Sequence, residues 1–282
     1  MSTHKTDSFI NKNGAHIFTQ QWTVENPVAG LLISHGIGEH SGRYEHVAEF
    51  FTAKGMSVFA LDHQGHGQSE GKRGHINSFV TFAQDLETLR QRAAAELGNK
   101  PIVLFGHSMG ALIVFEYLLN FPDNTAAAVL SAPPLAVQVN PAAWQKALLP
   151  VMKKLAPSLT LDNGIDAAWL SKDKTVVQAY RDDPLVHSKI SVTLYLEMTK
   201  SGERCLNAAD RISQPTLLLI AGEDKIIDEQ ALHQAFEQFT NPQKKKMIFK
   251  DDFHEIHNEP DQATEFEAIW QWLNSLPALN AR

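Results

Sequence analysis

The sequence predicts an α/β fold in which a mostly parallel central sheet is flanked by helices and carries an inserted helical cap. Short apolar runs alternate with amphipathic stretches along most of the 282 residues, as in chains that build parallel sheets. Most of the apolar runs are continuous, which is typical of strands covered on both faces. The alternation stops after about residue 132 and resumes near residue 212, so we expect an insertion there.

The expected strands follow in chain order. Residues 8–23 contain Asn13-Gly14, a hairpin signal, and predict antiparallel strands at one edge of the sheet. Apolar runs then predict strands at residues 31–34, 57–61, 102–105, 127–131, 216–220 and 246–249.

Helices are expected between these strands. Apolar residues recur at helical spacing over residues 79–97 and again over residues 266–276. The stretch after Ser108 is apolar nearly all round, so it predicts a buried helix, which Pro122 ends.

The interruption divides the chain into two expected parts. Residues 1–132 and 212–282 form the α/β core, and residues 133–211 form the helical cap, or lid, over the site.

One helical face of the cap is apolar. It carries Trp144, Leu148, Val151 and Leu155. Such a face either packs on the core or forms an apolar entrance that makes transient contact with membrane or micelle surfaces, and the sequence leaves both interpretations open. Trp144 and Leu148 are candidate substrate-binding residues.

Composition excludes several classes of protein. The net charge is −7 and the isoelectric point is about 6.0, so nothing indicates nucleic-acid binding. The single cysteine, Cys205, cannot form an internal disulfide, which favours the cytoplasm. No run has the length of a transmembrane helix. We expect a cytoplasmic protein whose only membrane contact is peripheral.

A Gly-x-Ser-x-Gly pentapeptide, residues 106–110, lies between an expected strand and the buried helix. A turn of this kind pushes the hydroxyl of its serine, Ser108, out of the backbone. A second match, around Ser69, lies in a loop with no apolar run directly before it and no helix directly after it. Ser108 is therefore the candidate nucleophile, and Ser69 is interpreted as a loop residue.

A nucleophilic serine needs a base, and the base needs an orienting acid that precedes it in the chain. After the strand at residues 216–220 come Glu223, Asp224 and Asp228. Asp228 suits the N-cap of the next helix. Asp224 is preferred as the acid, although spacing barely separates it from Glu223.

Two histidines follow the strand at residues 246–249. His257 lies nearer the turn into the last helix, and His254 could serve as a structural residue of the loop. The residues alone favour His257 but leave both open.

The negative oxygen of the reaction intermediate needs two hydrogen-bond donors. One is expected from the backbone amide of Met109, which follows the nucleophile. The other is expected from the amide of Ile37, because the strand at residues 31–34 leads into His35-Gly36-Ile37-Gly38.

Two rival interpretations concern a cofactor and a metal. Gly36, Gly38 and Gly42 resemble a dinucleotide fingerprint, but the third glycine falls one position late. Histidine pairs spaced three apart lack a third ligand at metal-site spacing. We therefore expect neither a cofactor nor a metal ion.

Longer strings resemble the monoacylglycerol lipase and lysophospholipase group of α/β-hydrolases. They are residues 35–44 (HGIGEHSGRY), residues 62–71 (DHQGHGQSEG), the pentapeptide at residues 106–110, and Asp183-Pro184-Leu185. The resemblance covers most of the chain and is weakest in the cap.

The resemblance implies an α/β-hydrolase fold with Ser108, Asp224 and His257 as the catalytic residues, and with Ile37 and Met109 as the oxyanion hole. It also implies that Glu39 and Arg43 help to hold a glycerol head group. A structural salt bridge between these two residues is the alternative.

The expected function is hydrolysis of the ester of a monoacylglycerol or lysophospholipid-like substrate through an acyl-enzyme. The partner is thus a lipid-like small-molecule ester. Alternatives are a carboxylesterase or acyltransferase on another small ester, a peptidase, or a catalytically silent ligand-binding protein of the same fold.

Overall fold

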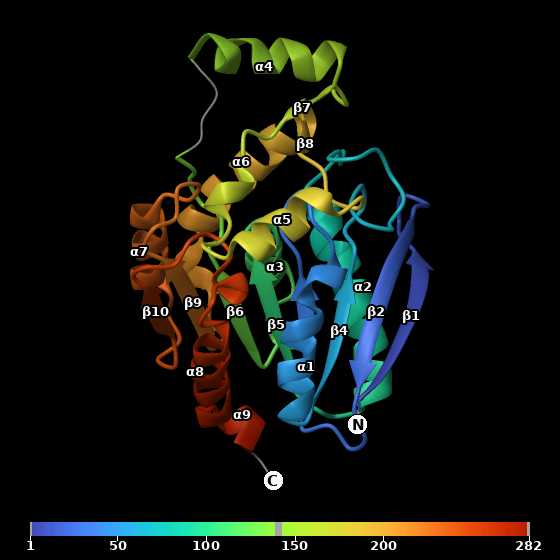
Figure 1. Ribbon diagram of the computed structural model, residues 1–282, viewed down its shortest axis with the longest axis vertical. Coiled ribbons are helices and arrows are strands. Elements are labelled where there is room, and N and C mark those ends of the chain that lie inside the picture. The colour runs from blue at the N-terminus through green and yellow to red at the C-terminus, as the bar shows by residue number, and fades with distance from the viewer. Residues whose placement is uncertain (1, 139–142, 281–282) are drawn as a thin grey trace.

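A central sheet organises the molecule (Figure 1). The computed structural model describes residues 2–138 and 143–280, except for the side chains of residues 123 and 143–146. In this part the main sheet has the strand order β1-β2-β4-β3-β5-β6-β9-β10. Its strands are β1 (Thr3–Ile10), β2 (His16–Thr23), β3 (Ala29–Ser34), β4 (Met56–Leu61), β5 (Ile102–His107), β6 (Ala127–Ser131), β9 (Thr216–Ala221) and β10 (Lys245–Phe249).

The hairpin expected around Asn13-Gly14 is confirmed at one edge of the sheet. β1 pairs antiparallel with β2, and β2 pairs antiparallel with β4. Gly14 supplies the positive φ, +81°, that the turn requires. The six apolar strands predicted from the sequence are also confirmed, and they pair in parallel.

Helices cover both faces of the sheet (Figure 1). One face packs against α1 (Glu45–Ala53) and α8 (Gln262–Ser275), and the short α9 (Pro277–Asn280) follows α8. The other face packs against α2 (Val80–Leu97), α3 (Met109–Asn120) and α7 (Glu229–Gln238). Side chains therefore alternate between two cores along each strand: Leu31 and Ile33 of β3 face α1 and α8, and Leu32 faces the other way.

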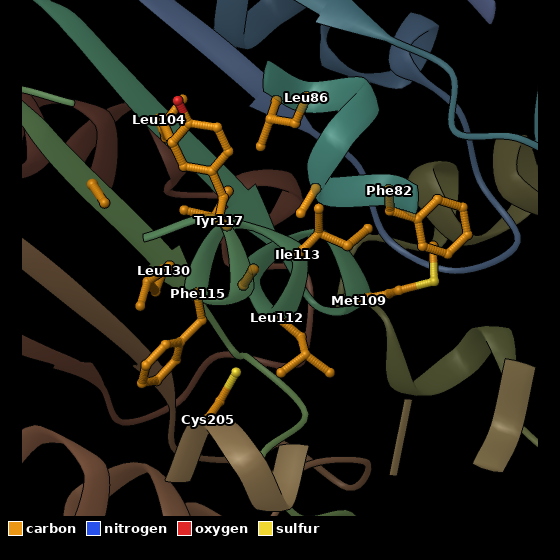
Figure 2. Close-up of a cluster of buried hydrophobic side chains, with 14 of the residues drawn as sticks. Phe82, Leu86, Leu104, Met109, Leu112, Ile113, Phe115, Tyr117, Leu130 and Cys205 are labelled. Carbon is orange, nitrogen blue, oxygen red and sulfur yellow. The ribbon is translucent and has the colours of Figure 1, made fainter. Parts of the chain in front are cut away.

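Helix α3 begins directly after Ser108 and is buried, as its composition predicts. Figure 2 shows Met109, Leu112, Ile113, Phe115 and Tyr117 pointing out from it into the surrounding apolar cluster. This packing fixes the start of α3, and with it the backbone of Ser108.

The segment expected to form the cap follows β6 and precedes β9. It contains α4 (Ala143–Leu155), β7 (Thr160–Asp162), α5 (Lys174–Asp182), β8 (Lys189–Ser191) and α6 (Val192–Asn207). In Figure 1, α4 lies at the top, above β7, β8 and α6. The sequence did not predict β7 and β8, a short antiparallel pair. Helix α6 packs against α3, where Ser201 Oγ donates to Glu116 Oε1 at 2.6 Å.

Among the described residues, no helix combines the length and the apolar character that crossing a membrane would require.

Candidate active site

Ser108 lies at the sharp turn between β5 and α3. Its backbone has φ +52° and ψ −124°, a conformation that residues other than glycine rarely adopt. The flanking glycines permit the turn. A Cβ on Gly106 would lie 2.5 Å from Gly110 O, and a Cβ on Gly110 would lie 1.9 Å from Ser34 O. Packing therefore maintains a strained backbone that presents the serine at the end of the sheet.

Ser69 has a different environment. Its Oγ donates to Asp62 O at 2.6 Å and accepts from Phe18 N at 2.8 Å. The hydroxyl thus ties its loop to β2, which agrees with its interpretation as a loop residue.

Asp224 forms a hydrogen bond with His254. The distance from Asp224 Oδ2 to His254 Nδ1 is 2.7 Å. Asp224 Oδ1 accepts from Ile226 N at 2.8 Å and from Ile227 N at 3.1 Å, so the carboxylate is held on both sides. Glu223 is exposed to solvent. Asp228 caps α7 by accepting from Gln230 N, as expected.

The Asp224–His254 contact shifts the pKa of both side chains. Burial lowers the pKa of His254, but the charge and hydrogen bond of Asp224 outweigh burial, and the net pKa is raised. Burial raises the pKa of Asp224, but the His254 ring and two backbone amides outweigh it, and the net pKa is lowered. The pair therefore favours a charged carboxylate beside an imidazole that readily takes up a proton.

The expected pairing of His257 with Asp224 is wrong. His257 is buried, and neither of its ring nitrogens has a hydrogen-bond partner in the described part of the chain. Its ring stacks on Tyr44, with centroids 4.8 Å apart and planes at 14°. Burial, followed by the nearby His107, lowers its pKa well below the usual value. His257 is a packing residue in the core.

Strand register explains why His254 meets Asp224. Ala221 and Phe249 are partners at the ends of the parallel strands β9 and β10. Asp224 follows Ala221 by three residues and His254 follows Phe249 by five, whereas His257 follows by eight. Counting from the strand ends could have found His254 in the sequence.

The loop expected to supply an oxyanion donor lies beside the nucleophile. A Cβ on Gly36 would be 3.3 Å from Ser108 Cβ. Ser108, Ile37 and His254 line the same small pocket. The amides of Ile37 and Met109 have no hydrogen-bond acceptor within residues 2–138 and 143–280.

Glu39 and Arg43, expected to hold a head group, pair with each other, and Arg43 also pairs with Glu255. Arg43 Nη1 lies 2.6 Å from Glu39 Oε2, and Arg43 Nη2 lies 2.6 Å from Glu255 Oε2. Glu39 Oε1 also accepts from Tyr44 Oη at 2.8 Å. Burial raises the pKa of Glu255, but Arg43 outweighs burial and lowers it strongly. The salt bridge given as the alternative is present.

A cavity of about 450 Å³ opens on Ser108. Ile37 and Met109 line it and are buried, and Leu148 lines it with 47% of its surface accessible. The remaining wall is mostly apolar and comes largely from the segment between β6 and β9, including residues that the sequence did not single out: Leu149, Met152, Ile165, Tyr195 and Met198. The side chain of Trp144, the other expected contact, lies outside the described part.

Known proteins resemble this chain in sequence and fold. Residues 25–261 match the family described as serine aminopeptidase, S33. The monoacylglycerol lipase of Mycolicibacterium smegmatis is 33% identical over 276 residues, or 97% of this chain and 98% of that protein. The human monoglyceride lipase is 31% identical over 95% of this chain and 90% of that protein. The crystal structure of Paleococcus ferrophilus monoacylglycerol lipase is 31% identical, with a TM-score of 0.81 and 99% coverage of both chains.

The parallel sheet, the strained serine turn and these relatives define the class: the chain is a serine hydrolase with the α/β-hydrolase fold. Within that class it belongs to the serine aminopeptidase S33 family.

Proposed function

We propose that this enzyme cleaves the ester of a monoacylglycerol or a closely related single-chain lipid through an acyl-enzyme. The observation that supports this proposal most directly is the apolar cavity of about 450 Å³ that leads to Ser108. Its size lies within the range of small-molecule sites. Its lining suits an acyl chain, and several relatives are named monoacylglycerol or monoglyceride lipases.

In the proposed mechanism, His254 takes the proton from Ser108 as the hydroxyl attacks the ester carbonyl. Asp224 holds the tautomer of His254 and stabilises the imidazolium. The amides of Ile37 and Met109 donate to the oxyanion, and each donor contributes about 3 kcal/mol to the barrier reduction. His254 then protonates the leaving alcohol, and water hydrolyses the acyl-enzyme with the same imidazole as base.

The family description raises the question of peptide substrates. A binding site for a free amino terminus needs a carboxylate oxygen near the nucleophile that is free to accept from the ammonium group. Glu39 and Glu255 line the small pocket beside Ser108, but each of their four carboxylate oxygens already accepts a hydrogen bond within the protein. This arrangement favours an uncharged ester over an aminoacyl amide.

A substrate panel tests this function. We expect kcat/KM to rise with acyl length among monoacylglycerols, by up to about fourfold for each methylene that becomes fully buried. Lysophospholipids and short-chain glycerol esters complete the panel, and aminoacyl p-nitroanilides should give no turnover above background. Faster hydrolysis of the anilides than of any ester would overturn the proposal.

The proposed cap, residues 133–211, also accounts for access to lipid. Leu148, Val151 and Leu155 of α4 have 47%, 54% and 78% of their surface exposed. We propose that this face touches lipid or micelle surfaces transiently and that the enzyme works in the cytoplasm, where its one cysteine stays reduced. Running the panel below and above the micelle-forming concentration of each lipid checks the surface contact, because it predicts a gain in rate above that concentration.

The acid is tested by its effect on turnover and on pH dependence. Asp224→Asn is expected to lower kcat by about 10⁴-fold, whereas Glu223→Gln, at the exposed neighbour, should change it little. The Asp224 charge raises the pKa of His254, and the base works only when neutral. In the wild type, kcat/KM should therefore fall with decreasing pH as His254 becomes protonated, with a midpoint above the ordinary histidine pKa of 6.5. In Asp224→Asn the midpoint of this acidic limb of the pH profile should move to lower pH. An unmoved limb would contradict the assignment of Asp224.

A further inference from the structure

Three carboxylates converge on the far side of the loop that carries His254. Asp252 belongs to that loop, Asp261 immediately precedes α8, and Glu265 lies in the first turns of α8. One oxygen from each lies within 4.8 Å of the other two. Glu265 is 1% exposed and Asp252 is 3% exposed, whereas Asp261 is open to solvent.

Three oxygens of this cluster lack a donor from the rest of the described chain. Both carboxylate oxygens of Glu265, and Oδ2 of Asp252, are buried without a hydrogen-bond donor from outside the cluster in the described part of the chain. Asp261 occupies the N-cap position of α8, but its side chain makes no capping hydrogen bond. Buried polar groups in folded proteins nearly always have a partner, so these oxygens point to a ligand.

The nearby cation does not account for the cluster. Lys172 Nζ lies 3.4 Å from Asp252 Oδ1 and 3.5 Å from Glu259 Oε2. It therefore contacts the other oxygen of Asp252 and a fourth carboxylate, rather than Glu265. The N-terminus of α8 favours nearby negative charge, but it gives no hydrogen bond to Glu265. One ammonium group faces four carboxylates here.

We propose that Asp252, Asp261 and Glu265 bind a divalent cation that prefers oxygen ligands, with Ca²⁺ as the best fit. Carboxylate oxygens are the ligands of hard cations. Ca²⁺ accepts oxygens at about 2.3–2.6 Å in flexible geometry, which suits oxygens up to 4.8 Å apart. Mg²⁺ needs a tighter octahedron and loses its water reluctantly. The exposed side of Asp261 leaves room for water ligands and a path of entry.

The cation would link α8 to the catalytic loop. Asp252 O accepts from Glu223 N at 3.0 Å, next to Asp224, and His254 follows Asp252 by two residues. A ligand that binds only the folded state stabilises it. Bound Ca²⁺ therefore raises the melting temperature and holds the loop of His254 in place.

The test uses the full chain after treatment with a chelator. Thermal unfolding is measured with CaCl₂, MgCl₂ or MnCl₂ for the wild type, for Glu265→Gln and for Glu267→Gln. Glu267 lies on the same helix but pairs with Lys54, outside the cluster, so Glu267→Gln is the matched control. We expect Ca²⁺ to raise the melting temperature of the wild type and of Glu267→Gln, and to leave that of Glu265→Gln unchanged.

Calorimetric titration should show Ca²⁺ binding to the wild type and to Glu267→Gln, and no binding to Glu265→Gln. If Glu265→Gln does not fold, the more exposed Asp261→Asn replaces it and should weaken Ca²⁺ binding by tenfold or more. The proposal is overturned if none of the three cations shifts the wild-type melting temperature. An equal shift in the cluster variant would also overturn it, since the ion would then bind elsewhere.

Discussion

Replacing His254 with alanine is expected to lower kcat for a p-nitrophenyl ester by about 10⁴-fold, because the variant has no base for Ser108 and no acid for the leaving alcohol. His254 is the histidine that Asp224 orients, at 2.7 Å. Steady-state hydrolysis with purified variants measures the loss.

The matched control is His257→Phe. This change keeps a ring to stack on Tyr44 and removes two nitrogens that bond to no described residue. We expect turnover within a few-fold of wild type and little change in stability. A loss in His257→Phe comparable to that in His254→Ala, with the fold intact by circular dichroism, would restore His257 as the base.

Ser108→Ala is expected to abolish the covalent adduct with a fluorophosphonate and to lower ester turnover by about 10⁴-fold or more. The strained backbone at φ +52° stays in place, because Gly106 and Gly110 determine the turn and alanine adds no bulk. Intact-protein mass spectrometry after labelling detects the adduct.

Ser69→Ala controls for the second pentapeptide. Its hydroxyl makes two hydrogen bonds inside the protein, with Phe18 N and Asp62 O. Losing them should cost about 1–3 kcal/mol of stability and leave labelling intact. Labelling that persists in Ser108→Ala and disappears in Ser69→Ala would reverse the assignment of the nucleophile.

Much of the fold follows from local sequence signals. The parallel strands are continuous apolar runs because both faces of the sheet are covered, and Asn13-Gly14 identifies the hairpin because few residues adopt its backbone conformation. β7 and β8 escaped prediction because three-residue strands show no periodicity. The packing of α6 on α3 depends on Glu116 and Arg204, 88 residues apart, and sequence spacing alone does not reveal such a contact.

The site was less predictable, since it depends on how separate loops meet. Ser108 could be found because a strand, a glycine turn and a helix are adjacent in the chain. Asp224 and a histidine could be expected only as candidates. The choice between His254 and His257 depends on where β9 and β10 end relative to each other, and on Asp252 O accepting from Glu223 N. The burial of Glu265 could not be predicted either, because a glutamate in an amphipathic helix usually faces solvent.

The central claim is that Ser108 and His254 act as one unit, and a double-mutant cycle tests it most directly. Residues that act together lose nearly the full rate when either is removed. We therefore predict that Ser108→Ala, His254→Ala and the double variant have similar residual rates of ester hydrolysis. A double variant slower than the wild type by the product of the two separate effects would show that the residues act independently, and would contradict the account.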